Sequence, residues 1–561
     1  MRLAWALPLL AACVTPARAD DPPAPNPLVP MIERYSVDLR ALERLHSTPL
    51  SAGRRDRLRV LHQAALKDVD ALDLGPLPVD ARIDAALFAN HLRHQVSELE
   101  REAVLDAEIA PLVPFAGAIV ALEDARREMK DVDAPRAAGT LTELAKAVKE
   151  ARKGVDEKKT SRTLARRASK RVDALQEALG RWHRFHAGYH PEYTWWCAKP
   201  YAEADRELEE YQTFLAEKVA RLKAEGPEGL VGDPLGREAL LRELAYERIA
   251  YGPEELLAAA ERQFAWCEER LKEASREMGF DDWAKALEKV KTAHVPPGKQ
   301  PALIRDLARE AEELMEKKDL LTVPPLAKEV WRMEMMSPER QKSTPYFTGG
   351  EVISVSFPTS DMPHDLKMMV MRGNNIHFAR ATVQHELIPG HHLQIFMAER
   401  HRTHRRLFRT AFLVEGWCLY WEMRLWDLGF ARGPEDRIGM LFWRMHRAAR
   451  IITTLKFHLG QMPPAEMVDF LVKRVGHEPS GAEAEVRRYI GGDYGPLYQV
   501  AYMMGGLQLL ALHKELVGSG RLTERAFHDA VLRENSIPID LIRAGLTGAA
   551  PTPSASWKFL D

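Results

Sequence analysis

Apolar residues at helical spacing dominate this sequence, and they constrain its fold more than any other feature. The helical pattern runs from the end of a Pro-rich leader at Pro30 to about residue 340. Short breakers interrupt it, such as Gly75-Pro76, Gly226-Pro227 and Pro296-Pro297-Gly298. Helical patterns resume at Phe378 and continue almost to the Pro-containing tail at Pro551. We therefore expect a large, mostly α-helical fold built from antiparallel helices.

One helix start is well marked. Gly252-Pro253 is followed by Glu254 and Glu255, so a proline and two acidic residues occupy the first turn, where they suit the exposed amides of a helix N-terminus. The apolar residues that follow at helical spacing are Leu256, Ala259, Ala260, Phe264, Cys267 and Leu271. This pattern predicts an amphipathic helix that begins at Pro253.

The segment from Tyr346 to Pro358 has a different character. Gly349-Gly350 favours a turn, and β-prone residues follow, namely Val352, Ile353, Val355 and Phe357. The sequence therefore predicts a small β element within 346–358. Just upstream, Met333-Glu334-Met335-Met336 is interpreted as core or as the wall of a cleft.

The first residues are typical of an export signal. Arg2, an apolar run from Leu3 to Val14 and the small-residue pattern Ala17-Arg18-Ala19 predict a secretory signal peptide at residues 1–19. The run is too short to span a bilayer. Leu10-Ala11-Ala12-Cys13 also resembles a bacterial lipobox, in which Cys13 would carry a lipid anchor. We expect an exported protein, periplasmic or extracellular, either released or tethered through Cys13, with no other membrane contact.

Charge and cysteine content exclude several classes of function. Lys and Arg number 79 against 81 Asp and Glu, a net charge of −2. Removing residues 1–19 takes away Arg2 and Arg18, leaving 77 against 81, or −4. This balance does not predict nucleic acid as a partner. The remaining cysteines, Cys197, Cys267 and Cys418, are odd in number and widely spaced, so they predict neither a disulfide framework nor a cysteine zinc site.

One segment has strong chemical content: Gln384-His385-Glu386-Leu387-Ile388-Pro389-Gly390-His391-His392. It is a variant of the zinc-protease helix HExxH, in which two histidines four residues apart share a metal and the glutamate reaches the water on that metal. Zinc is therefore the expected cofactor, with His385 as a ligand and Glu386 as the general base.

The spacing of the histidines does not fit an unbroken helix. Six residues turn about 600°, which leaves His385 and His391 about 120° apart around the axis. His392 restores the face, but its Cα is about 10.5 Å along the axis from that of His385. Pro389 cannot donate to the carbonyl of His385, and Gly390 tolerates unusual backbone angles, so a local bulge could bring His391 to the metal. His392 stays open as the second ligand, and the alternative to a site is a Pro-kinked helix with two ordinary histidines.

A third ligand is expected from the next helix. Glu415 lies in the apolar segment Val414-Glu415-Gly416-Trp417-Cys418-Leu419-Tyr420-Trp421-Glu422, 24 residues after His391. A buried acid is costly without a partner, and a metal supplies one. Glu422 is the alternative for the third ligand, or it contacts a ligand without binding the metal itself. A salt bridge to one of the nearby arginines is the alternative for either residue.

These two segments resemble a bacterial family of uncharacterised proteins that are proposed to be zinc metallopeptidases. The family is defined by the motif HExxPGHH followed by EGWxLYxE. That family is similar in arrangement to helical gluzincins such as angiotensin-converting enzyme and thimet oligopeptidase. The likeness extends from the helix start at Pro253 to a C-terminal block. It implies an N-terminal helical region at 20–340 and a metal-binding catalytic helical region at 341–561, with a cleft.

The C-terminal block carries the last candidates. Glu485-Val486-Arg487-Arg488-Tyr489, Pro496 and Tyr502-Met503-Met504-Gly505 resemble the family segments E-V-x-R-Y and P-x-Q-x-x-x-Y-x-x-G. Tyr498 stands where the family usually has Gln, and the loop Gly491 to Gly495 is longer than usual. The likeness implies that Tyr502 faces the oxyanion and that Arg488 binds a substrate carboxylate or supports the site. Packing in the core is the alternative for both.

The expected activity is hydrolysis of a peptide or small protein. Zinc held by two histidines and a carboxylate keeps a place for water, Glu386 takes its proton and passes it to the departing amine, and the strand near Val352 to Val355 aligns an extended substrate. Two alternatives remain: an exported helical scaffold that binds peptides without turnover, and hydrolysis of a non-peptide amide. Substrate sequence, endo or exo cleavage and oligomeric state do not follow from the sequence.

Two further groups are interpreted as structural. His183 and His186 share a helix face but have no acid at ligand spacing. The basic segment Arg400-His401-Arg402-Thr403-His404-Arg405-Arg406 is interpreted as a solvated turn between the two expected metal-binding helices.

Overall fold

The structure is a computed structural model that describes residues 26–224, 226–341, 347–492 and 494–560. Helices make up 71% of it, which confirms the expected mostly α fold. Within these residues no helix combines the length and the hydropathy that a membrane span requires. The predicted signal peptide and Cys13 lie outside the described residues, as does Tyr346 at the start of the predicted β segment.

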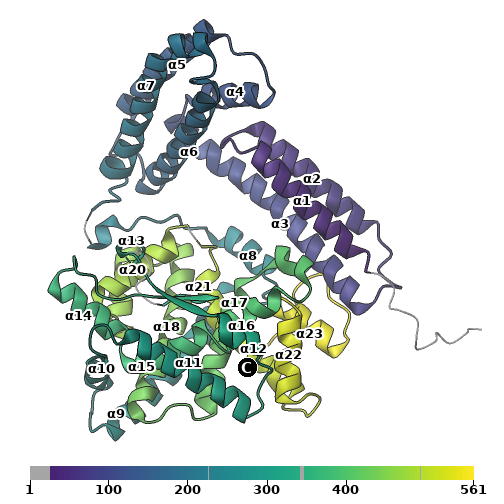
Figure 1. Cartoon of the computed structure of the whole chain (residues 1–561), viewed down its shortest axis with the longest axis vertical. Coiled ribbons are helices and arrows are strands. Elements are labelled where there is room, and N and C mark those ends of the chain that lie inside the picture. The colour runs from purple at the N-terminus through teal and green to yellow at the C-terminus, as the bar shows by residue number, and fades with distance from the viewer. Residues whose placement is uncertain (1–25, 225, 342–346, 493, 561) are drawn as a thin grey trace, which may run out of the picture.

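The N-terminal part consists of two helical bundles that stand on a larger body (Figure 1). The first bundle contains α1 (Leu28–Leu45), α2 (Ala52–Asp70) and α3 (Val79–Ile109). The second contains η1 (Ala110–Leu112), α4 (Ala116–Arg127), α5 (Ala134–Gly154), α6 (Arg162–His186), α7 (Pro191–Thr213) and the π-helical turn η2 (Phe214–Val219). The second bundle has a hydrophobic cluster of its own, whereas α1 and α3 contribute to the cluster of the body.

The body begins with the helices that precede the small sheet. They are η3 (Gly226–Gly229), α8 (Arg237–Tyr246), α9 (Pro253–Glu277), α10 (Trp283–Lys291), α11 (Gln300–Lys317) and α12 (Pro325–Val330). α9 starts at Pro253 as predicted, and the carboxylate of Glu255 accepts a hydrogen bond from the amide of Gly252 at 2.8 Å. The six apolar residues predicted for its inner face are all buried.

The rest of the body contains the residues of the candidate site. Its elements are α13 (Pro338–Gln341), α14 (His364–Gly373), α15 (Ile376–Glu386), α16 (His391–Ala398), η4 (Thr403–Phe408), α17 (Ala411–Asp427), α18 (Pro434–His458), α19 (Pro464–Phe470), η5 (Leu471–Val475), α20 (Pro479–Ile490), α21 (Tyr498–Leu516), α22 (Glu524–Arg533) and α23 (Ile539–Thr547). The main hydrophobic cluster combines residues from both sides of the boundary expected at residue 340.

The predicted β element forms a two-stranded parallel sheet. β2 (Val352–Val355) pairs with β1 (Arg332–Met335), and Arg332 lies opposite Val352 in the register. β1 overlaps residues 333–336, which had been interpreted as core or cleft wall. This strand was not predicted because four residues are too few for a recognisable strand pattern. Thr348 and Ser354 form an antiparallel bridge, so β2 has backbone partners on both sides.

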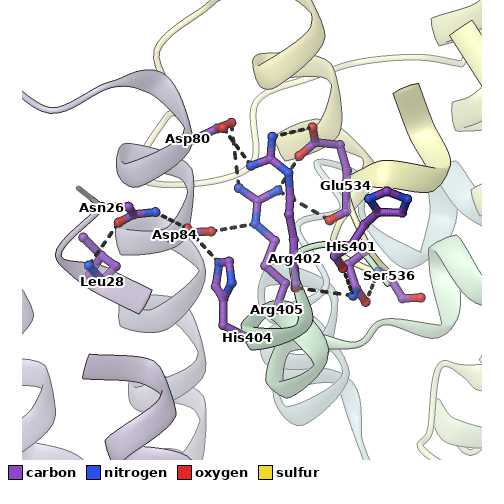
Figure 2. Close-up of polar contacts among 11 residues, drawn as sticks. Asn26, Leu28, Asp80, Asp84, His401, Arg402, His404, Arg405, Glu534 and Ser536 are labelled. Carbon is purple, nitrogen blue, oxygen red and sulfur yellow. Dashed lines mark hydrogen bonds and ion pairs between the residues drawn. The ribbon is translucent and has the colours of Figure 1, made fainter. Parts of the chain in front are cut away.

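The basic segment between α16 and α17 is not the solvated turn that was expected. The side chain of Arg405 is fully buried in η4, and its Nε donates a hydrogen bond to Asp84 of α3 at 2.6 Å (Figure 2). Its Nη1 donates to the carboxylate of Glu534. His404 Nε2 lies 3.0 Å from the second oxygen of Asp84. This cluster joins the N-terminal bundle to the segment between the two expected metal-binding helices.

Candidate metal centre

The helix that carries His385 ends at Glu386, and a new helix begins at His391. Leu387 leaves the helical region with φ −109° and ψ −109°, and the Ile388-Pro389 peptide bond is cis. A Cβ on Gly390 would lie 1.9 Å from the carbonyl oxygen of His385, so only glycine fits at this position. The Pro-Gly step thus separates two helices, where a bulge within one helix had been expected.

This break brings His391 beside His385. The two ring centroids lie 5.0 Å apart, and the ring planes are at 84° to each other. His392 takes a different direction, because its Nε2 donates a hydrogen bond to the carbonyl oxygen of Ala327 at 2.7 Å. Of the two open alternatives, His391 therefore faces His385 and His392 does not.

Glu415 of α17 faces both imidazoles. Its Oε2 lies 3.6 Å from Nε2 of His385 and 3.2 Å from Nε2 of His391. This oxygen is buried and forms no hydrogen bond with any described residue. The other oxygen, Oε1, accepts a hydrogen bond from the hydroxyl of Tyr498. Tyr498 therefore orients the carboxylate so that its second oxygen points at the two rings.

Glu422 stands behind His385 and does not compete with Glu415 for the same place. Its Oε1 accepts a hydrogen bond from Nδ1 of His385 at 2.6 Å, and Nε2 of that ring faces Glu415. Glu422 also lies 3.4 Å from Nη2 of Arg447. A carboxylate on the far nitrogen of a histidine is the usual support of a metal ligand.

The electrostatics of this group call for a cation. Burial lowers the pKa of His385, but the nearby carboxylates of Glu415 and Glu422 outweigh this effect and raise the pKa to about 9. Burial raises the pKa of Glu415, and the two imidazoles lower it well below its ordinary value. Three carboxylates, with Glu386 as the third, thus surround two histidine rings. A divalent cation would balance this charge while leaving both rings neutral.

The distances fit zinc in particular. Zinc binds histidine nitrogen and carboxylate oxygen at about 2.0–2.2 Å, so the edges of a tetrahedral site are about 3.4 Å long. The separations of 3.2 Å and 3.6 Å from Glu415 Oε2 to the two nitrogens correspond to such edges. The donor set of two imidazoles and one carboxylate is also a known catalytic set for zinc.

Cys418 is the nearest additional donor. Its sulfur lies within 4.8 Å of a nitrogen of both His385 and His391. Burial raises the pKa of this thiol well above its ordinary value, so it stays protonated, and it contacts the carbonyl oxygen of Val414 at 3.5 Å. A protonated thiol is a poor ligand. Cys197, Cys267 and Cys418 are all buried, and they form no disulfide among the described residues.

Glu386 and the segment before β2 form one wall of a cavity of about 270 Å³. Burial raises the pKa of the Glu386 carboxyl. A Cβ on Gly349 would lie 2.4 Å from both the backbone oxygen and Oε2 of Glu386. Phe347, Thr348 and Gly349 line the cavity, whereas β2 itself does not. Val352–Val355 had been expected to align a substrate. This strand has no free edge at the cavity for that role within the described residues.

Tyr502 and Arg488 both line the same cavity. The ring of Tyr502 stacks on His385 with the centroids 6.1 Å apart. Burial raises the pKa of the Tyr502 phenol well above its ordinary value, so it remains a proton donor at neutral pH. α21, the helix that carries Tyr502, packs closely against α17 because Gly416 and Gly505 meet where the two helices cross. A Cβ on Gly416 would lie 2.6 Å from Gly505.

Sequence reasoning missed three residues of this cavity. Arg447 and Arg450 of α18 lie 4.7 Å and 4.5 Å from the centroid of the Tyr502 ring. Tyr498 was noted only as a departure from the family pattern, although it binds Glu415. Arg447 and Arg450 lie three residues apart in a helix with many apolar residues, and this spacing was the available indication of their role in the sequence. Two arginines on one buried helix face are costly without partners.

Comparison with known proteins places the chain in a family. The family of bacterial proteins of unknown function DUF885 matches residues 41–546. The chain belongs to the DUF885 family. No curated protein matches this DUF885 chain.

Two solved structures are similar to this DUF885 protein. One is a predicted lipoprotein of unknown function from Shewanella oneidensis, with a TM-score of 0.69 at 16% identity, covering 93% of this chain and 99% of the other. The second is a predicted lipoprotein from Colwellia psychrerythraea, with a TM-score of 0.58 at 14% identity, covering 93% and 98%. At this identity the likeness establishes a shared fold alone.

Proposed function

We propose that this chain is a zinc-dependent peptidase in which His385, His391 and Glu415 hold the metal and Glu386 acts as the general base. The observation that supports it most is the buried Oε2 of Glu415. This oxygen has no hydrogen bond to any residue that the structure describes, and it faces the Nε2 atoms of both histidines at 3.2–3.6 Å. A bound zinc ion supplies Lewis acidity, which makes water a better nucleophile and a carbonyl a better electrophile.

The protein's own groups perform the remaining tasks. Glu386 follows the ligand His385 directly, and its raised pKa suits a carboxylate that accepts a proton from water and returns it to the departing amine. Tyr502 is a neutral donor on the cavity wall, suited to the developing oxyanion. Glu422 and Tyr498 hold His385 and Glu415 in place.

Export belongs to the same proposal. The residues before Leu28 carry the signal-peptide and lipobox patterns described above, and both solved relatives are themselves predicted lipoproteins. We assign the chain to the outside of the cytoplasmic membrane, anchored through lipid on Cys13. Labelling with radioactive palmitate tests this anchor. The Cys13→Ala variant is expected to lose the label, while the labelling of total cell protein stays unchanged.

The metal site is tested by comparing adjacent histidines. The purified protein is expected to contain one equivalent of zinc by elemental analysis, and His391→Ala is expected to lose it. His392→Ala is the matched control, because the imidazole of His392 points to Ala327 and its loss leaves the candidate ligands intact. Equal zinc content in the two variants would remove the basis of the proposal.

Catalysis is tested separately from metal binding. Glu386→Gln keeps the shape of the side chain but cannot accept a proton, so it is expected to retain zinc and to lose hydrolysis of a peptide library by roughly 10²–10⁴-fold. A parent protein that holds zinc but cleaves no peptide would favour the scaffold alternative.

A further inference from the structure

The cavity beside the candidate metal centre has a surplus of positive charge. Among the described residues that line it, two carboxylates, Glu386 and Glu415, stand against five arginines. The arginines are Arg340, Arg409, Arg447, Arg450 and Arg488. Such a surplus of positive charge in a cavity attracts anions. The surplus is informative only if some of the guanidinium groups lack an internal partner.

Three of the arginines have a carboxylate partner inside the protein. Arg450 pairs with Glu485, Arg447 lies 3.4 Å from Glu422, and Arg340 lies 3.3 Å from Glu334. The guanidinium groups of Arg447 and Arg450 also stack on the ring of Tyr502. The charges of these three arginines are therefore compensated, and two of them serve to hold Tyr502.

Arg488 and Arg409 are different. Among the described parts of the chain, no carboxylate lies within 4.0 Å of either guanidinium group. Arg488 is partly buried, and its Nε is a buried donor without a hydrogen bond. Arg409 is exposed, at the edge of the cavity next to the start of α17. A buried donor without a hydrogen bond is costly, and a guanidinium group that is not paired with a carboxylate favours an anion beside it.

The position of Arg488 connects it to the metal centre. Its guanidinium carbon lies 4.7 Å from the centroid of the Tyr494 ring, and that ring lies 4.4 Å from the ring of Tyr498. The hydroxyl of Tyr498 in turn binds Glu415. Two aromatic rings thus separate Arg488 from the candidate ligand Glu415, and all of these residues line one cavity. An anion on Arg488 would be held at a defined place relative to the candidate metal.

We propose that the substrate carboxylate expected at Arg488 is the free C-terminus of a peptide, so that the protein removes residues from peptide C-termini. The planar fork of Arg matches a carboxylate with two parallel hydrogen bonds. The cavity volume of about 270 Å³ is near the lower end of the range for ligand sites, a size that suits the few residues at the end of a peptide. This inference rests on the proposed peptidase function.

The test uses the full chain with zinc and three peptides of one sequence. The first ends in a free acid, the second in an amide, and the third in an amide with an internal Glu that offers a side-chain carboxylate. Binding is measured by calorimetry on Glu386→Gln, and the cleavage site is determined by mass spectrometry on the unmutated protein. The free acid is expected to bind roughly 10- to 100-fold more tightly than both amides, with cleavage near its C-terminus.

Variants at adjacent positions locate the carboxylate site. In the Glu386→Gln background, Arg488→Ala is expected to abolish the preference for the free acid and Arg488→Lys to keep part of it. Arg487→Ala is the matched control, because Arg487 is the exposed neighbour on the same helix and does not line the cavity. Circular dichroism establishes that each variant is folded, and the comparison of acid with amide on the parent needs no variant at Arg488.

The outcomes separate this inference from the proposed function. Equal binding of acid and amide, an unchanged preference in Arg488→Ala, or a preference for the internal Glu overturns the carboxylate site, while cleavage of any of the peptides leaves the peptidase proposal in place. Tight, Arg488-dependent binding of the free acid without cleavage by the parent supports the carboxylate site and overturns the peptidase.

Discussion

The indole Nε1 of Trp417 donates a hydrogen bond to the carbonyl oxygen of Pro389, 2.8 Å away. Trp417 lies two residues after the candidate ligand Glu415, and Pro389 lies between the candidate ligands His385 and His391. One hydrogen bond therefore ties the α15–α16 break to α17. The two sequence segments that carry the family resemblance contact each other at this point, and the contact sets how the carboxylate meets the imidazoles.

Trp417→Phe removes this donor and leaves the carbonyl of Pro389 without it. We expect the free energy of unfolding to fall by about 1–3 kcal/mol, with weaker zinc binding, because the break between the helices loses its anchor. Chemical denaturation and zinc titration measure the two effects. Trp421→Phe is the control, since the buried Nε1 of Trp421 donates no hydrogen bond within the described part of the chain. Equal zinc affinity in the two variants would contradict the role of Trp417.

Glu422→Gln tests the support of His385. The carboxylate of Glu422 binds Nδ1 of His385 and orients the ring, so its neutral analogue is expected to lower zinc affinity by roughly 10- to 100-fold. Competition with a chromogenic chelator measures the affinity. Asp436→Asn changes a comparable pair, because Asp436 lies 2.6 Å from Nδ1 of His377 at the other end of α15, and it is expected to leave zinc binding unchanged.

Gly349→Ala tests the position of Glu386. A Cβ at this position would lie 2.4 Å from two oxygens of Glu386, so either the segment before β2 or the carboxylate must move. A displacement of about 1 Å at a reacting group costs on the order of 100-fold in rate, and we expect that loss in kcat/KM with zinc retained. Gly373→Ala has no neighbour within 4 Å of the new Cβ and is expected to keep full activity. Normal activity of Gly349→Ala would show that Glu386 does not need its present position.

Asp84→Asn tests the cluster in Figure 2. Asp84 and Arg405 are both fully buried, so removing the negative charge leaves a guanidinium group with less compensation and is expected to cost about 3–5 kcal/mol of unfolding free energy. Asp80→Asn is the control. Asp80 is 46% exposed in its pair with Arg402, and its loss is expected to cost less than about 1 kcal/mol. Urea denaturation gives both values, and similar costs would mean that burial does not matter here.

Glu247 predicts a pH dependence of stability away from the metal centre. Burial raises the pKa of this carboxyl to about 7, although it accepts a hydrogen bond from Thr410. The folded state therefore holds a proton that the unfolded state releases near pH 4.5. The contribution of Glu247 to stability is largest below pH 4.5 and declines as the pH rises to about 7.

Glu247→Gln removes this titration. Relative to the parent protein, the variant is expected to gain stability steadily between pH 4.5 and 7, by about 2–3 kcal/mol in total. Thermal and urea unfolding across this range measure the difference. Parallel pH profiles of the two proteins would show that the pKa of Glu247 is close to its ordinary value.

The sequence by itself determined the helical class, the start of α9 at Pro253, and the short list of chemically active side chains. Helical periodicity and turn residues are local properties, so they can be read without knowing what packs against them. The same is true of the break at Pro389-Gly390, which the sequence placed correctly. It did not determine whether that break was a bulge in one helix or a boundary between two.

Only the tertiary structure decided which of the candidates meet. His391 faces His385 because α16 starts anew after Gly390, and His392 is directed to Ala327 of a helix more than 60 residues earlier. Glu415 and Glu422 share one helix and similar burial, and their places relative to His385 depend on how α17 crosses α15 and α21. Arg405 sits in a basic segment that resembles a solvated turn, yet Asp84, more than 300 residues earlier, makes its burial possible. Contacts over such separations arise from packing between elements, which no local pattern in the chain encodes.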